Sequence, residues 1–190
     1  MNMFKIDSEH FDGDVVVISP TKKFCDARGF FAIEFRKDNF RDLGLPNEFV
    51  QDNCSRSAAG VVRGLHFQLE PPMGKLMHVT SGCAYLVTVD LRPKSPTFLK
   101  WFGIEASAQN RIQVWAPADF ARGYCALENH TDVHYKCTAY FNALGDNAIA
   151  WNDPDIGVKW PTKYPILSDR DKTAQSLKQY MMSQRYKGLI

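Results

Sequence analysis

The chain has 190 residues, of which 45% are hydrophobic and 13% aromatic, and these proportions are typical of a globular protein with a substantial core. Its 23 basic and 21 acidic residues nearly cancel, so the formal charge is only +2 and no general polyanion-binding surface is indicated. We therefore expect no nucleic-acid binding, and we expect any basic site to be local, as one phosphorylated small molecule requires.

The five cysteines are dispersed and form no Cys-x-x-Cys pair, so the sequence encodes neither a zinc ribbon nor a redox motif. The first residues lack the apolar stretch of a signal peptide, and no segment approaches the ~20 apolar residues of a membrane span. These features predict a soluble, cytoplasmic protein without membrane association.

Short strand-like segments follow one another along the chain and are separated by Gly, Pro and Asn. The predicted strands span 15–18, 29–35, 60–68, 76–80, 83–91, 99–105, 111–116, 121–127, 132–141 and 148–151. Turn signals about every 8–12 residues are typical of an antiparallel sandwich or barrel. No helix of βαβ length intervenes and Gly-x-Gly-x-x-Gly is absent, which disfavours a doubly wound dinucleotide-binding fold.

Helix signals concentrate near the end of the chain, whereas residues 40–45 suit either a short helix or an irregular loop. Ser168 and Asp171 come close to a capping box, and Leu177, Tyr180 and Met181 then recur at helical spacing. We predict a helical segment over about 168–186. Because no repeat, linker or change of composition is present, residues 1–190 are expected to form one domain.

A histidine between two cations is the most informative chemical feature. His66 lies in the predicted strand 60–68, three residues after Arg63 and shortly before Lys75. In a regular strand the even-numbered residues would share the face of His66, and Arg63 would point the other way. Nearby cations favour the neutral imidazole that a general base needs. His66 is therefore the candidate base, with a hydrogen-bonded structural histidine as the alternative.

The same histidine is poorly placed to bind a divalent metal. Metal-binding cupin barrels carry a His-x-His pair, but here the second position of the pair is Gln68, and Arg122 occupies the place of their last histidine. Cations such as Lys75 and Arg122 repel a metal ion. We predict no metal.

Other polar side chains have a chemical and a structural interpretation. Tyr135 can be interpreted as a general acid or as a packing residue. Lys75 can be interpreted as a group that stabilises an enolate or a phosphate, or as an ordinary solvated lysine. Arg28 and Arg63 offer the forked guanidinium that binds diphosphate, with surface ion pairs as the alternative. For Asp171, the helix cap alone is a sufficient explanation.

Ten segments together carry a more specific signal. In order, they are DARGFF (26–31) with Glu34, FVQDNCS (49–55), GVVRGLHFQ (60–68), GKL (74–76), VDLR (89–92), SPTF (95–98), PADFARG (117–123), YKCT (135–138), WNDP (151–154) and LSDRD (167–171). This ordered set, spanning about residues 14–171, resembles the dTDP-4-dehydrorhamnose 3,5-epimerase family.

The resemblance implies an all-β jelly-roll cupin, usually a homodimer, that works without metal or nicotinamide cofactor. It implies that His66 is the base, paired with Asp171, that Tyr135 is the acid on the opposite sugar face, and that Lys75 stabilises the enolate at O4. The positions that match substrate binding by the same resemblance are Arg28, Glu34, Gln51, Asn53 and Arg63, with Arg122 and Phe141 at the sugar end of the pocket.

Three departures surround that sugar end. Arg122 stands where the family usually has a histidine, Phe141 where it usually has a second tyrosine, and residues 142–145 lack the usual Pro and Glu. We therefore expect the epimerase chemistry to be kept, while the preferred sugar nucleotide and the carbon inverted (C3, C5 or both) differ from the standard reaction.

The expected substrate is a nucleoside-diphosphate 4-keto-6-deoxysugar or a related keto sugar. Two alternatives stay open: a 3,4-ketoisomerase on the same scaffold, which would use the same enediol, and a non-catalytic cupin that only binds a sugar nucleotide. The intact set of His66, Tyr135, Lys75 and Asp171 argues against the non-catalytic alternative.

Overall fold

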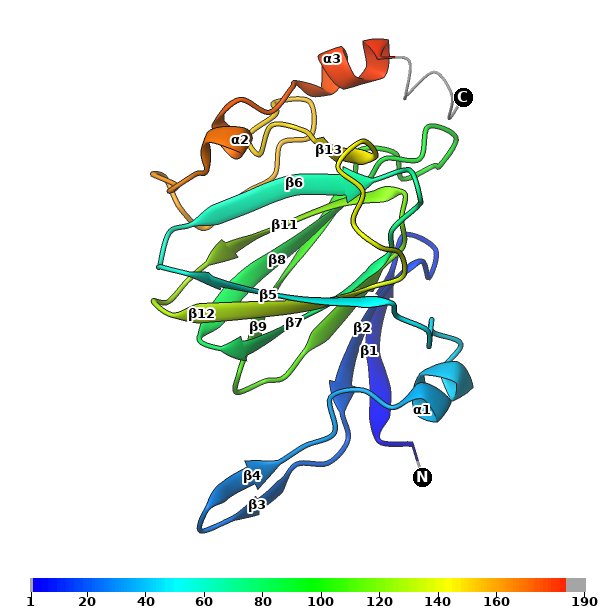
Figure 1. The fold of residues 1–190 in the computed structure, drawn as a ribbon, viewed down its shortest axis with the longest axis vertical. Coiled ribbons are helices and arrows are strands. Elements are labelled where there is room, and N and C mark those ends of the chain that lie inside the picture. Colours follow the sequence, from blue (N-terminus) through cyan, green and yellow to red (C-terminus); the bar gives the residue numbers. More distant parts are fainter. Residues whose placement is uncertain (1, 184–190) are drawn as a thin grey trace.

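The computed structural model describes residues 2–183, and most of its regular structure lies in two antiparallel sheets that face each other (Figure 1). One sheet has six strands in the order β1 (Phe4–His10), β2 (Val15–Pro20), β10 (Gln113–Ala116), β7 (Lys75–Ser81), β12 (Thr131–Cys137) and β5 (Gln51–Ser57). The other has five in the order β13 (Asp146–Ala148), β6 (Val62–Gln68), β11 (Phe120–Ala126), β8 (Cys83–Asp90) and β9 (Trp101–Ser107).

Strands that are neighbours in these sheets are mostly distant in sequence, so the chain repeatedly crosses from one sheet to the other. β2 pairs with β10, and β6 pairs with β11, each across a long stretch of chain. Such crossovers between two antiparallel sheets are characteristic of a jelly roll. The predicted all-β jelly-roll cupin fold is confirmed.

A short hairpin projects away from this barrel at one end (Figure 1). It consists of β3 (Phe24–Asp26) and β4 (Gly29–Phe31), and both strands are exposed to solvent. The helices among residues 2–183 are α1 (Lys37–Asp42), α2 (Asp169–Lys172) and α3 (Leu177–Met182). None of them is long and apolar enough to cross a membrane.

Three apolar clusters hold these layers together. The first fills the interior between the two sheets and includes Leu86, Phe120 and Val133. The second lies on the outer face of the five-stranded sheet, where α3 covers it with Leu177 and Tyr180. The third lies on the outer face of the six-stranded sheet and is covered by α1 and the segment around it. Each sheet is therefore buried on both faces over part of its area, which explains the continuous apolar runs in strands such as β11.

Most of the predicted strands are present, with bounds that shift by up to three residues, although β12 ends at Cys137, four residues before the predicted end at 141. The expected strand over 29–35 is shorter than predicted, since β4 ends at Phe31. Strands β1, β3 and β5 were not predicted at all. β5 is the instructive case, because its sequence QDNCSRS holds no large apolar residue and gives no hydrophobic periodicity. Its alternate residues are nevertheless half-buried, since they face a polar interior.

The C-terminal segment contains two short helices instead of one. Residues 173–176 separate α2 from α3, and the predicted continuation to residue 186 lies outside the described residues. The capping box is at the second helix, where the Ser176 side chain and Gln179 satisfy each other's backbone N–H groups. The alternative left open for residues 40–45 is resolved in favour of a helix, α1, which starts three residues earlier.

Candidate active site

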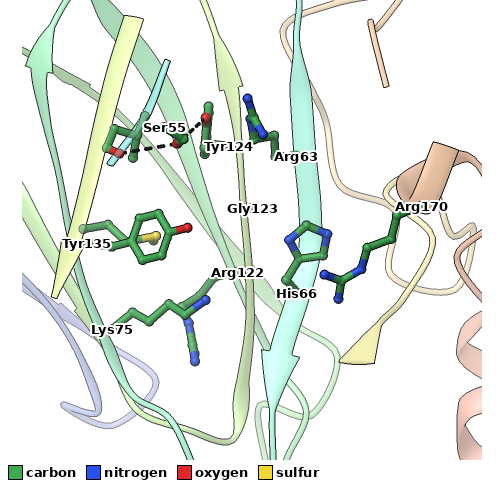
Figure 2. Close-up of a pocket in the computed structure, with 11 residues that line it drawn as sticks. Ser55, Arg63, His66, Lys75, Arg122, Gly123, Tyr124, Tyr135 and Arg170 are labelled. Carbon is green, nitrogen blue, oxygen red and sulfur yellow. Dashed lines mark hydrogen bonds between the residues drawn. The ribbon is translucent and has the colours of Figure 1, made fainter. Parts of the chain in front are cut away.

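A polar cavity of about 250 Å³ opens inside one end of the barrel (Figure 2). Its lining residues come from both sheets and from α2: Ser55, Arg63, His66, Lys75, Met77, Arg122, Gly123, Tyr124, Val133, Tyr135 and Arg170. Five of the residues predicted from the sequence are thus brought together in one cavity, although they come from four different strands. Those five are Arg63, His66, Lys75, Arg122 and Tyr135.

A bulge in β6 places Arg63 and His66 on the same side. His66 pairs with Arg122 and Arg63 pairs with Tyr124, so three steps along β6 oppose two steps along β11. The extra residue shifts the strand's alternation by one position. The prediction that Arg63 faces away from His66 is therefore wrong, because it assumed one regular strand.

Two glycines allow β6 and β11 to approach at this bulge. Gly64 has a φ of +132°, and a Cβ added there would lie 2.6 Å from Gly123 Cα. A Cβ added to Gly123 would lie 2.7 Å from the Arg63 carbonyl oxygen. Both distances are far inside van der Waals contact, so larger residues would separate the strands that carry the site.

His66 is bound to Asp171 by a hydrogen bond of 2.6 Å between Nε2 and Oδ1. Asp171 is almost fully buried at the first turn of α2, and its other oxygen accepts a hydrogen bond of 2.7 Å from Ser168 Oγ. Burial by itself raises the pKa of the Asp171 carboxyl, but the hydrogen bonds from His66 and Ser168 outweigh it and lower the pKa below its ordinary value. Asp171 is therefore an ionised carboxylate at neutral pH.

This carboxylate also decides the tautomer of the imidazole. An ionised carboxylate only accepts hydrogen bonds, so the Nε2 of neutral His66 carries the proton and Nδ1 keeps a free lone pair. The Ser168 hydroxyl accepts the Asp171 backbone N–H at 3.1 Å and so caps α2. Asp171 thus belongs to a helix cap and to a histidine–carboxylate pair at once, although from the sequence the cap alone was a sufficient explanation.

Tyr135 lies across the cavity from His66, on the opposite sheet (Figure 2). Burial raises the pKa of the Tyr135 phenol above its ordinary value, with further contributions from Cys137 and Tyr124. The phenol is therefore protonated at neutral pH and can donate a proton. A base on one wall and an acid on the facing wall are suited to a flat intermediate held between them.

Lys75 extends into the cavity from the start of β7, and its Nζ lies 4.9 Å from the centre of the Tyr135 ring. Within residues 2–183 its ammonium forms no ion pair with a carboxylate. Burial, followed by the charge of Arg122, lowers the pKa of Lys75 from an ordinary 10.5 to about 8. Lys75 is thus charged at neutral pH but desolvated, as a group that stabilises a developing oxyanion should be.

Arg122 lines the cavity but does not extend its guanidinium into it. Its nitrogens donate to the carbonyl oxygens of Pro117 (3.1 Å), Phe120 (2.8 Å) and Met73. The side chain is almost fully buried, and burial lowers its pKa to about 10, so it remains a cation. The prediction of Arg122 as a direct substrate ligand is not supported by this orientation, because most of its donors are already bonded to backbone carbonyls.

Gln51, Asn53 and Phe141 lie near the cavity without lining it. Asn53 pairs with Tyr135 across β5 and β12, and its amide oxygen accepts a hydrogen bond of 3.0 Å from Gln51 Nε2. Gln51 Oε1 in turn accepts the backbone N–H of Phe141 at 2.8 Å, while the Phe141 ring is 57% exposed. These three residues therefore form one connected group beside the cavity, at the end where β12 finishes.

Arg28 and Glu34 are not brought to the cavity of their own chain. Arg28 is at the exposed tip of the β3–β4 hairpin, where it pairs with Asp26 at 2.6 Å. Glu34 lies on the outer face of the six-stranded sheet and forms an ion pair with Arg111. The prediction that both residues bind substrate is therefore not met within one chain, because the hairpin carries Arg28 away from the barrel and Glu34 is held on the outer face by Arg111.

The sequence did not reveal Ser55, Tyr124 and Arg170 as cavity residues. Tyr124 Oη bonds to Ser55 Oγ at 2.9 Å, and Arg170 pairs with Asp146 at 2.6 Å. Ser55 and Arg170 lie inside segments that resemble the family, so they were available as candidates. Only the partner strand and the bulge, however, show that Tyr124 faces inward.

Among residues 2–183, no three or more His, Cys, Asp or Glu side chains are grouped so as to hold a metal ion. Instead, the cavity collects the cations Arg63, Lys75, Arg122 and Arg170 around the His66–Asp171 pair. Such an arrangement suits an anionic organic molecule that is deprotonated inside the cavity.

Comparison with known proteins gives one consistent result. Residues 13–179 match the family model described as dTDP-4-dehydrorhamnose 3,5-epimerase. A protein of that name from Shigella flexneri is 43% identical over 164 residues, which are 85% of this chain and 90% of the relative. A longer one from Neisseria gonorrhoeae is 46% identical over 159 residues, and the match covers 83% of this chain but only 48% of that relative.

The barrel also superposes on solved structures. The crystal structure of dTDP-4-dehydrorhamnose 3,5-epimerase from Bacillus anthracis, with TDP and PPi bound, matches with a TM-score of 0.88 and 43% sequence identity. That match covers 92% of this chain and 99% of the solved one, so the two chains share the whole architecture.

The geometry around His66 predicts a single neutral tautomer. We expect ¹⁵N NMR of the imidazoles to show His66 protonated at Nε2, because Oδ1 of Asp171 only accepts. Asp171→Asn should abolish this preference, since an amide can donate as well as accept. Ser168→Ala is the matched control: it removes the α2 cap and lowers stability but should leave the Nε2–H tautomer. A native His66 with its proton on Nδ1 would contradict this assignment.

Proposed function

This chain belongs to the dTDP-4-dehydrorhamnose 3,5-epimerase family and is a carbohydrate epimerase, and we propose that its substrate is a dTDP-linked 4-keto-6-deoxysugar that His66 deprotonates beside the ketone. The observation that carries this assignment is the 2.6 Å bond between His66 and the buried Asp171, on the wall facing Tyr135. The bond leaves Nδ1 of His66 as a base next to a cavity lined with cations.

The proposed reaction follows from the acidity that a 4-keto group confers on its neighbours. His66 removes the proton from C3 or C5, and the electron pair of the C–H bond moves through the new double bond to O4. The Lys75 ammonium stabilises the negative charge at O4. Tyr135 then returns a proton to the same carbon from the other face of the sugar, which inverts the centre.

The cavity of about 250 Å³ has room and polar groups for a sugar ring. The nucleotide attached to that sugar is therefore proposed to lie outside the cavity. Arg63 is the proposed diphosphate ligand: it lines the cavity, and hydrogen bonds to Ser57 Oγ (3.2 Å) and to the carbonyl of Arg56 (3.2 Å) hold its guanidinium. The group formed by Gln51, Asn53 and Phe141 is the proposed continuation of the site toward the nucleoside. The TDP bound to the Bacillus anthracis relative supports this class of ligand.

We propose that the protein acts as a homodimer in which the hairpin of one subunit completes the site of the other. Arg28 cannot serve its own cavity from the tip of β3–β4, yet the family resemblance assigns it to substrate binding. The hairpin also exposes large aromatic side chains, Phe24 at 51%, Phe30 at 52% and Phe31 at 65%, which a partner subunit would cover.

We further propose that residues 1–190 form one domain that works in the cytoplasm. The unbroken match to the family over residues 13–179 supports a single unit. All five cysteines are free, and those at 25 and 54 are exposed, as is usual in a reducing compartment.

Solvent exchange tests the proposed function directly. Incubated in D₂O with dTDP-4-keto-6-deoxyglucose, the native protein should incorporate deuterium at C3, C5 or both, as read by proton NMR. His66→Asn should slow every exchange by about 10²–10⁴ because one base serves each carbon. His130→Asn, the same substitution at an exposed histidine in the turn between β11 and β12, is the matched control and should retain exchange. A shifted carbonyl would indicate the ketoisomerase, and no exchange in the native protein would indicate a binding protein.

A second experiment separates the acid from the base. Tyr135→Phe removes the proton donor on the far wall but leaves the His66–Asp171 pair, so deuterium should still enter the carbon while net inversion slows. The measurement is the ratio of wash-in to product formation in D₂O. If both fall together, Tyr135 binds the sugar and does not protonate it.

Mixed dimers test the role of Arg28. Arg28→Ala and His66→Asn homodimers should both have little activity, whereas a hybrid of the two restores one site that has both Arg28 and His66. Arg41→Ala, another exposed arginine, is the control and should behave as the native protein. Hybrids as inactive as their parents would show that Arg28 does not complete the partner's site.

A further inference from the structure

Arg122 and Lys75 form an unusual pair, since two cations share one buried region beside the cavity. Both line the cavity, from β11 of one sheet and β7 of the other, and Figure 2 draws both side chains below Tyr135. Like charges in a desolvated region repel strongly, so such a pair persists only where the fold holds it in place.

The fold holds Arg122 through backbone carbonyls and not through a carboxylate. Two of its bonds go to Pro117, just after β10, and to Phe120, the first residue of β11, and the third goes to Met73, two residues before Lys75. Carbonyl oxygens solvate the guanidinium without neutralising it. The positive charge of Arg122 is therefore retained, and it acts on Lys75. The bond to Met73 also attaches Arg122 to the segment that leads into β7.

One donor of Arg122 remains free. Its Nε is buried and, within the described part of the chain, has no hydrogen-bond partner. Arg111 Nε, on the outer face of the barrel, is unpaired in the same way, so a free donor by itself does not distinguish the two arginines. What distinguishes Arg122 is that it lines the cavity together with Lys75.

The charged groups around Lys75 decide in which direction its pKa moves. Arg122 on β11 and Arg170 on α2 lower that pKa, while Cys137 on β12 and Asp146 on β13 raise it. Asp146 is itself paired with Arg170 at 2.6 Å, which reduces its influence on Lys75. The Tyr135 phenol faces Lys75 from β12 and is uncharged at neutral pH. Burial lowers the pKa of Lys75 the most, and among the charged groups Arg122 has the largest effect.

Building on the proposed epimerase reaction, we propose that Arg122 is a positioning residue that makes Lys75 a proton donor to O4 of the sugar. When His66 takes the proton from carbon, the C–H electron pair forms the new C=C bond, and the carbonyl pair on O4 takes a proton from the Lys75 ammonium. The N–H bond of Lys75 breaks, and a neutral amine and a neutral enol result. Re-forming the ketone returns that proton to Lys75.

This mode of action requires Lys75 to lose its proton near neutral pH. With a pKa of about 8, Lys75 is mostly charged at pH 7 but donates far more readily than an ordinary lysine. The sign of the pH dependence follows: the competent form is the ammonium, so activity falls as the pH rises through that pKa. Removing the Arg122 charge must move this fall to higher pH.

The test is the pH dependence of kcat/KM on dTDP-4-keto-6-deoxyglucose between pH 6 and 10. The native enzyme should lose activity above about pH 8. Arg122→Gln keeps a buried amide but no charge, and it should move the alkaline limb upward by at least roughly half a pH unit. Arg41→Gln is the matched control: it removes the same charge from an exposed arginine on α1, outside the cavity, and should leave the limb unmoved. An unmoved limb in Arg122→Gln overturns the proposal.

Lys75→Arg supplies an independent check, because it retains a cation that does not release its proton. It should lower kcat and remove the alkaline limb, and a full native rate in this variant would overturn the donor role.

A titration without substrate separates this inference from the proposed function. In protein labelled with [¹³Cε]lysine, the signal missing from Lys75→Arg is assigned to Lys75, and its midpoint in the native protein should lie near 8. A midpoint near the ordinary 10.5 overturns the inference even if Arg122→Gln does not fold. Absence of epimerase turnover, with a midpoint near 8 that rises in Arg122→Gln, would instead reject the proposed function and leave the electrostatic effect of Arg122 standing.

Discussion

One extra residue in β6 determines which side chains meet inside the barrel. The bulge opposite β11 brings Arg63 and His66 to the same face, and the contact between Gly64 and Gly123 makes the close approach possible. Without it, either the proposed base or the proposed diphosphate ligand would point out of the cavity. The strand is embedded between β13 and β11, so its register is fixed from both sides.

Electrostatics divides the cavity between its two walls. On the five-stranded sheet, His66 is supported by the one buried carboxylate that it contacts, and Ser168 and the start of α2 hold that carboxylate in place. On the six-stranded sheet, the Tyr135 phenol is kept protonated by burial. The cations lie between these groups, where the proposed enolisation would develop a negative charge. The proposed base, acid and oxyanion site are thus separated in space, because each needs a different local environment.

The departures at the sugar end affect the site in different ways. Arg122 replaces the usual histidine with a permanent cation, but the backbone carbonyls around it accept the larger side chain, and Lys75 experiences its charge. The resemblance implies that Phe141 lies at the sugar end, but its side chain is largely exposed and its backbone N–H is bonded to Gln51, in the group proposed to face the nucleoside. In the proposed reaction, the first change would act on the chemistry at O4 and the second on recognition of the substrate.

The sequence alone determined the fold class, since short apolar segments between turn residues require an antiparallel barrel. It also indicated His66, Lys75, Tyr135 and Asp171, because their types and ordered context resemble one family. It did not reveal β5, because a strand that faces a polar cavity carries no apolar pattern.

Only the tertiary structure decided where the side chains point. The bulge reversed the expected face of Arg63, the carbonyls of two loops turned Arg122 away from the substrate, and the hairpin carried Arg28 out of its own cavity. All three outcomes depend on contacts between residues far apart in the chain, which local periodicity does not encode.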